Sequence, residues 1–169
     1  SDFTNIKANG KIAMKLEDGE RLIAVRPCSE AEDVLLATRA GKCIRFPVGD
    51  VRVFSGRTST GVRGVKLASG DEVISMSVLR HAEFDIAERD AYLRMSKRRR
   101  GVEAENGEAA NGNGNGHGEG AEAPVPVVSL SEERYSAFAV QEEFILSVTE
   151  NGFGKRTSAY EYRVTGRGG

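Results

Sequence analysis

Short apolar runs separated by polar, glycine-containing turns recur along the chain. They form three pairs, which are 34–38 with 43–46, 62–67 with 73–79, and 144–149 with 153–157. Two such runs around a tight turn are typical of a β-hairpin. The first and third turns contain Gly41 and Gly152, and glycine readily supplies the positive φ that such turns need. The pattern therefore predicts three hairpins.

The same pattern repeats at a fixed spacing. Residues 3–23 align without a gap on residues 54–74, an offset of 51, with Phe, Gly, Lys and Leu coinciding. Residues 34–45 align on 145–156 at an offset of 111, which is one period plus an insert of about 60 residues. A unit of about 50 residues with about four strands has the size of a propeller blade. The alternative is a generic β-sandwich with accidental similarity.

The hairpin pattern breaks after residue 80. Residues 83–100 are rich in Glu, Arg and Lys and have apolar positions at partly helical spacing, which predicts a short helix. Residues 101–126 have low complexity, with Asn, Gly, Glu and Ala, and such a segment buries too little apolar area to offset the entropy of ordering. Residues 127–140 are ambiguous, since they either extend this segment or re-enter the fold.

These patterns predict an all-β fold of partial, propeller-like blades, each with about four antiparallel strands, together with a short helix and a disordered insert. The expected parts are a blade region, a helical insert, an acidic Gly/Asn-rich disordered linker and the start of the next blade. Their boundaries are 1–80, 81–100, 101–140 and 141–169, respectively.

Charge is distributed unevenly along the chain. The formal net charge is −1, which by itself gives no indication of nucleic-acid binding. Residues 101–143 nevertheless hold nine Glu and one Arg, whereas residues 39–66 hold seven Lys or Arg and a single acid, Asp50. The net charge of the whole chain therefore combines a basic folded part with an acidic insert.

Basic residues recur at corresponding places in the repeats. A cation at a fixed place on every blade would form a positive rim that matches DNA phosphates without reading bases. The alternative is an ordinary solvated polar face. The candidate DNA-binding residues are Lys42, Arg45, Arg52, Arg57, Arg63, Lys155, Arg156, Arg163 and Arg167. The cluster Lys97-Arg-Arg-Arg100 is either an additional DNA contact or a charged helix end favoured by the helix dipole.

No residue pattern indicates catalysis, a metal site or a bound nucleotide. The two cysteines, Cys28 and Cys43, lack a neighbouring Cys or His at metal-ligand spacing and are each expected to be a buried or free thiol. Residues 152–157, Gly-Phe-Gly-Lys-Arg-Thr, do not match a phosphate-binding P-loop, because Thr149 and Arg156 occupy positions where that motif needs Gly and Ser or Thr. We expect no catalytic residue and no cofactor in this chain. No apolar run is long enough to span a membrane, and no leader pattern begins the chain, so a cytoplasmic location is expected.

Five segments carry a resemblance to a known family. They are Ala40-Gly-Lys-Cys-Ile-Arg-Phe46, Val51-Arg52, Gly56-Arg-Thr-Ser-Thr-Gly-Val-Arg-Gly64, Thr149-Glu-Asn-Gly-Phe-Gly-Lys-Arg-Thr157 and Glu161-Tyr-Arg163. In order and spacing they resemble the blade repeats of the DNA gyrase A C-terminal domain family. The resemblance covers about residues 1–80 and 141–169, and the stretch between them looks like a lineage-specific insertion.

The resemblance implies a β-pinwheel, a propeller-like disc whose blades exchange strands and whose basic perimeter wraps double-stranded DNA without sequence specificity. The nine candidate residues occupy positions that match the family's DNA contacts. The family's complete enzyme is a type II DNA topoisomerase that introduces negative supercoils, with ATP and Mg²⁺ bound elsewhere. Its implied partners are DNA, the rest of the gyrase A protein and the gyrase B protein, in the bacterial cytoplasm at the nucleoid.

The chain also departs from the family pattern. The hallmark box Gln-Arg-Arg-Gly-Gly-Lys-Gly is absent, and Gly166-Arg-Gly-Gly169 only echoes it. The sequence does not include the catalytic tyrosine region or the ATPase part of the enzyme, so we expect a non-catalytic fragment. Two alternatives stay open at this point, the homologous C-terminal domain of topoisomerase IV and a protein-interaction propeller.

Overall fold

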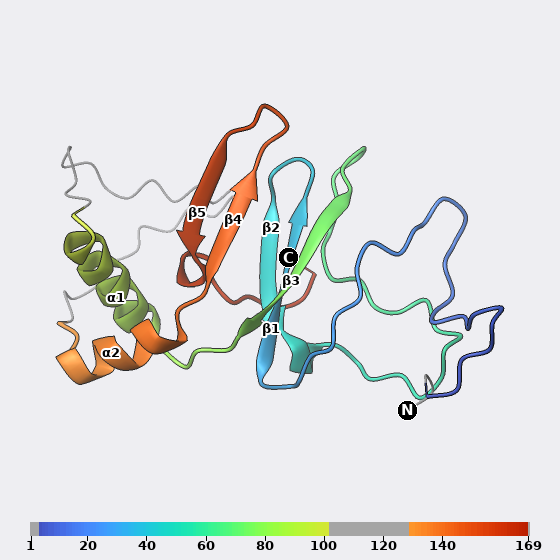
Figure 1. Cartoon of the computed structure of the whole chain (residues 1–169), viewed down its shortest axis with the longest axis horizontal. Helices are drawn as coiled ribbons and strands as arrows, with labels where there is room; N and C mark the ends of the chain where they lie inside the picture. The colour runs from blue at the N-terminus through green and yellow to red at the C-terminus, as the bar shows by residue number, and fades with distance from the viewer. Residues whose placement is uncertain (1–3, 102–128, 169) are drawn as a thin grey trace. The chain divides into compact units, whose positions relative to one another are not determined.

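The computed structural model describes residues 4–101 and 129–168 (Figure 1). The chain forms two compact units, one of residues 1–81 with 162–169 and the other of residues 82–161. The first unit holds a three-stranded antiparallel sheet, and the second holds two helices and a two-stranded hairpin.

The sheet of the first unit contains β1 (Glu32–Thr38), β2 (Cys43–Pro47) and β3 (Val73–Arg80), in the order β2-β1-β3. β1 and β2 form the first predicted hairpin, and a short 3-10 helix, η1 (Val48–Asp50), follows β2. The hairpin turn closes through a hydrogen bond of 2.8 Å from the Thr38 amide to the Lys42 carbonyl, and Gly41 has the expected positive φ of 80°.

Apolar side chains on this sheet form the core of the first unit. Leu35, Ile44, Phe46 and Leu79 are buried. Gly64 packs against the sheet so closely that a Cβ at this position would lie 2.8 Å from Cδ1 of Leu36. A side chain at this position would therefore require the Leu36 side chain to move.

The predicted second hairpin, 62–67 with 73–79, is wrong in its first half. Residues 62–67 are not a strand, and their one bridge joins Val65 to Gly168 in parallel. β3 instead pairs along its whole length with β1, from Glu32↔Arg80 to Thr38↔Val73, and a bulge lies at Ala37/Thr38. β3 lies at the edge of the sheet and residues 62–67 do not join it there, so the described part of this unit contains three strands where about four were expected.

The second unit contains α1 (Ile86–Arg99), α2 (Glu132–Gln141), β4 (Phe144–Val148), β5 (Gly154–Ser158) and η2 (Ala159–Glu161). The predicted short helix is present as α1, and β4–β5 is the predicted third hairpin. Aromatic side chains form the core of this unit: Tyr92, Phe138 and Tyr160 are buried, with Phe84 and Tyr135 packed beside them.

The predicted disordered linker, 101–140, needs a correction at its end, because α2 occupies 132–141. Tyr135 and Phe138 lie three residues apart on one side of α2 and pack against Tyr92 of α1, which offsets the entropy of ordering the segment. Most of the remaining predicted linker, residues 102–128, lies outside the described residues.

The sequence repeat is visible in the backbone. Glycines that correspond at the offsets of 51 and 111 all have positive φ of similar size. The pairs are Gly10 (78°) with Gly61 (84°), Gly19 (86°) with Gly70 (77°), and Gly41 (80°) with Gly152 (81°). Equivalent turns therefore have the same handedness in successive repeats.

Candidate nucleic-acid interface

The two units carry charge of opposite sign. Residues 1–81 and 162–169 contain 15 Lys or Arg and 10 Asp or Glu, whereas residues 82–161 contain 9 Lys or Arg and 15 Asp or Glu. The first unit thus has a net charge of +5 and the second has −6. The net charge of the whole chain is −1 because these opposite charges nearly cancel. Seven of the nine predicted cations belong to the first unit, and Lys155 and Arg156 belong to the second.

Arg45 is removed from the predicted DNA contacts because its side chain is buried. Its guanidinium is 2% exposed and donates from Nε to Oδ2 of Asp33 at 2.8 Å, and a second nitrogen, Nη2, lies 2.8 Å from the same oxygen. Asp33 itself is fully buried, and its Oδ1 lies 2.9 Å from Nδ1 of His81, within hydrogen-bond distance. Arg45 therefore neutralises a buried carboxylate and holds β1 to β2.

Sequence reasoning missed this cluster of Asp33, Arg45 and His81. Asp33 precedes the apolar run of β1 and looks like a turn residue, and His81 follows β3. The strand pairing brings them together, since Asp33 lies opposite Leu79 on β3 and next to the cross-strand pair Leu35↔Arg45. Asp33 lies two residues before Leu35, which pairs with Arg45 across the hairpin. This spacing of an acidic and a basic residue on neighbouring strands is the local signal for the ion pair.

Arg57 and Arg167 have anchored guanidinium groups. Arg57 donates to the carbonyl of Ile12 at 2.8 Å, and Arg167 donates to the carbonyl of Arg63 at 2.8 Å. Ile12 and Arg63 are themselves separated by 51 residues, the repeat offset, so both arginines make the same interaction in successive repeats. A hollow of about 600 Å³ lies beside Arg57 and is lined by residues 9–12.

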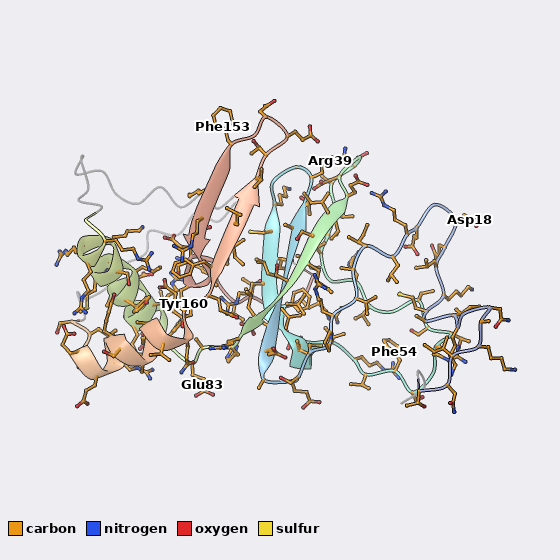
Figure 2. The ribbon with its side chains drawn as sticks, in the orientation of Figure 1. Asp18, Arg39, Phe54, Glu83, Phe153 and Tyr160 are labelled. Atoms are coloured by element: carbon orange, nitrogen blue, oxygen red, sulfur yellow. The ribbon has the colours of Figure 1, made fainter. Side chains whose placement is uncertain are left out.

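Lys42, Arg52, Arg63 and Arg163 are exposed in the first unit. Within the part of the chain that the structure describes, none of these four side chains is paired with a carboxylate. Arg52 lies over the ring of Phe54, which Figure 2 labels, at 5.3 Å from its centroid. The four charges are therefore available to a ligand from outside.

The turn that presents Lys42 is fixed by acidic residues at the start of β3. Oδ1 of Asp71 accepts from the Ala40 amide at 3.0 Å, and Arg39, labelled at this turn in Figure 2, forms an ion pair of 2.6 Å with Glu72. The Ala40 amide is the main cause of a lowered pKa for the Asp71 carboxyl, with a further hydrogen bond from Thr38. The network orients the turn without using the Lys42 ammonium in an ion pair.

In the second unit, Lys155 and Arg156 lie on β5 and are exposed. Arg156 stacks over the ring of Phe144 on β4, 3.6 Å from its centroid, while Lys155 is opposite Ser147. Phe153, beside the turn of this hairpin, is 76% exposed (Figure 2). The Gly-Lys of this segment belongs to a strand and not to a strand-to-helix turn, which agrees with the rejection of a P-loop.

Among the described residues, no group of three or more His, Cys, Asp or Glu side chains is arranged to hold a metal ion. Cys28 and Cys43 are both free thiols, as predicted. None of the helices that the structure describes has the length and hydrophobicity of a membrane span.

Antiparallel hairpins whose glycine turns recur at a fixed spacing define a propeller-like β-repeat class of protein. The chain belongs to the family of the DNA gyrase C-terminal domain, a β-propeller, whose model matches residues 1–29, 32–80 and 143–169. The match confirms the predicted propeller-like fold, and residues 81–142, which contain both helices, lie outside the matched segments.

Whole-chain comparison agrees with this assignment. The chain is 52% identical over 172 residues to the DNA gyrase A protein of Granulibacter bethesdensis, covering 100% of this chain and 18% of the relative. It is 50% identical over 168 residues to the DNA gyrase A protein of Rickettsia bellii, which covers 99% of this chain and 17% of the relative. It is 31% identical over 169 residues to that of Staphylococcus aureus, which covers 100% of this chain and 12% of the relative. The chain thus spans less than a fifth of the length of these relatives.

Proposed function

We propose that this chain binds duplex DNA through its phosphates and acts as a DNA-wrapping segment of the gyrase A protein. The observation that carries the proposal is the set of exposed cations without carboxylate partners in the net-positive first unit of a chain from this family. Because these side chains are Lys and Arg on turns and loops, they match a phosphate backbone and not a particular base sequence.

Six cations are expected to contact DNA phosphates, four in the first unit and two in the second. Arg45 is excluded by burial, and Arg57 and Arg167 are committed to carbonyl groups and contribute charge only from fixed positions. The six are Lys42, Arg52, Arg63, Lys155, Arg156 and Arg163. If each neutralises one phosphate, the logarithm of the binding constant falls against the logarithm of salt concentration with a slope of about −5.

The role within a complete enzyme follows from the same proposal. The chain supplies no catalytic residue and no ATP or Mg²⁺ site, and the rest of the gyrase A protein and the gyrase B protein supply these functions of a type II topoisomerase. Wrapping of positive handedness by this segment directs strand passage towards negative supercoiling. The complex acts in the bacterial cytoplasm on nucleoid DNA.

Fluorescence anisotropy with two labelled duplexes of unrelated sequence tests the proposal. The 169-residue chain should bind both with similar affinity, and Lys42→Gln/Arg52→Gln/Arg63→Gln should reduce the magnitude of the salt slope by about 3 on both. The charge-conserving variant Lys42→Arg/Arg52→Lys/Arg63→Lys should keep the wild-type slope. Affinity that does not depend on salt, or a loss on one sequence alone, contradicts phosphate binding.

A topology assay tests the wrapping role. The parent gyrase A protein with this segment, combined with the gyrase B protein and ATP, should convert relaxed plasmid to a negatively supercoiled form. The same protein without the segment should relax or pass DNA but lose negative supercoiling. Equal supercoiling by both forms contradicts the wrapping role while leaving DNA binding intact.

A further inference from the structure

The exposed side of α1 carries two arginines that the β repeats do not account for. α1 begins at a capping box, in which the Asp85 side chain accepts from the Glu88 amide at 2.7 Å and the Glu88 side chain accepts from the Asp85 amide. Tyr92 and Ser96 then face the aromatic core and are buried. The helix is thus held in one orientation within its unit.

Arg94 and Arg98 lie on the opposite side of the same helix. An α-helix has about 3.6 residues per turn, which places residues 94 and 98 one turn apart and roughly opposite Tyr92 and Ser96. Both arginines are exposed. Within residues 4–101 and 129–168, neither guanidinium has a hydrogen-bond or ion-pair partner.

The neighbouring cations at this helix end are paired. Lys97 lies 3.4 Å from Glu161, Arg99 is paired with Glu132, and Arg100 lies 2.7 Å from Glu142. The cluster 97–100 that the sequence singled out therefore divides, among the residues described, into three structural ion pairs and one cation, Arg98, without a partner. Arg94 joins Arg98 in forming a small positive face.

Two like charges one turn apart repel each other, so the fold gains nothing from placing them together. Helix Cβ atoms at this spacing are about 5–6 Å apart. Alternate phosphates of one DNA strand are about 7 Å apart along the axis, within reach of two arginine side chains. The planar guanidinium also binds phosphate oxygens in pairs.

We propose that Arg94 and Arg98 bind phosphates of duplex DNA, which gives the helical segment outside the family match its own DNA-contacting surface. The inference rests on the proposed function, since it assumes that the chain binds DNA. It extends that function to α1, which lies within the segment 81–142 that the family model does not match.

The test is the salt dependence of DNA binding by the 169-residue chain, followed by anisotropy of a fluorescein-labelled duplex. Arg94→Gln/Arg98→Gln should reduce the magnitude of the slope by about 2, and each single variant by about 1. The matched control Arg94→Lys/Arg98→Lys should keep the wild-type slope. Circular dichroism should show unchanged helix content, because both side chains are on the exposed side of the helix.

The outcomes separate this inference from the proposed function. A wild-type slope in Arg94→Gln/Arg98→Gln, with a reduced slope in Lys42→Gln/Arg52→Gln/Arg63→Gln, overturns the α1 surface and leaves the β-repeat interface standing. Absence of salt-dependent binding by the wild-type chain overturns both. The slope could also fall equally in Arg94→Gln/Arg98→Gln and in its control Arg94→Lys/Arg98→Lys. This result overturns the proposal too, since loss of charge would then not be the cause.

Discussion

Replacing Arg45 by methionine should destabilise the first unit severely. The change removes the guanidinium that neutralises Asp33, a carboxylate with 0% exposure, at 2.8 Å. Methionine keeps much of the aliphatic volume but leaves the buried charge without its partner, and loss of one member of such a pair costs about 3–5 kcal/mol. His81, whose side chain is 36% exposed, keeps its 2.9 Å contact with the other carboxylate oxygen of Asp33 in this variant.

The assay is chemical unfolding in urea, followed by circular dichroism, with the thermal midpoint as a second readout. In a chain of this size a loss of 1 kcal/mol shifts the midpoint by about 2–4 °C, so the variant should melt about 10 °C lower. Asp33→Leu/Arg45→Met removes both charges and should be more stable than Arg45→Met alone, because no uncompensated charge remains.

If Arg45→Met lowers the free energy of unfolding by less than about 1 kcal/mol, the reasoning is refuted, since a buried carboxylate without its partner should cost more than this. Additive effects in the double variant would refute it as well, because coupled charges must show a coupling energy. The same experiment separates structure from binding: under conditions where Arg45→Met is folded, its DNA salt slope should equal that of the wild type.

Three further predictions concern packing, pH and the acidic insert. Gly64→Ala should cost about 1–3 kcal/mol in urea unfolding because its Cβ would meet Leu36 at 2.8 Å, whereas Gly49→Ala, with no atom within 4 Å, should cost little; equal effects would contradict the close approach. Burial raises the pKa of Tyr92 to about 12, above the value of about 10 in an unfolded chain, so its contribution to stability is complete below about pH 10 and disappears as the pH rises towards 12. Tyr92→Phe should abolish this alkaline loss in unfolding experiments, and an unchanged pH profile would show that another group causes it. Replacing the five glutamates between 102 and 128 by glutamine should strengthen DNA binding at low salt, because it changes the net charge from −1 to +4; unchanged anisotropy titrations would show that this acidic segment does not oppose DNA.

Local sequence was sufficient for the turns and hairpins. Gly41 and Gly152 adopt the positive φ expected of them, and β1–β2 and β4–β5 form around them. These elements are predictable because glycine is the residue that enters the left-handed region without a steric penalty, and because both strands of a hairpin are adjacent in sequence. The start of α1 has the same local origin, since Asp85 and Glu88 cap it from within four residues.

The path of β3 and the order in α2 depended on partners far away in the chain. Residues 62–67 have the composition of a strand, but β3 pairs with β1, some forty residues earlier, and not with them. The segment around Tyr135 follows a low-complexity stretch, and its local sequence predicts part of the linker. It is helical because Tyr92 and Tyr160 provide an aromatic surface for it. Neither partner is visible in a local window of sequence.

For the candidate interface, the sequence by itself determined which residues are cations and that they recur with the repeat. The tertiary structure alone decided which of these charges face solvent. Arg45 lies one strand away from a buried carboxylate, Arg57 and Arg167 are held by carbonyl groups of the preceding repeat, and Arg63 has no such partner among the residues described. The reason is physical: a guanidinium is free to bind a phosphate only when no neighbouring group has already neutralised, desolvated or hydrogen-bonded it, and the folded chain determines those neighbours.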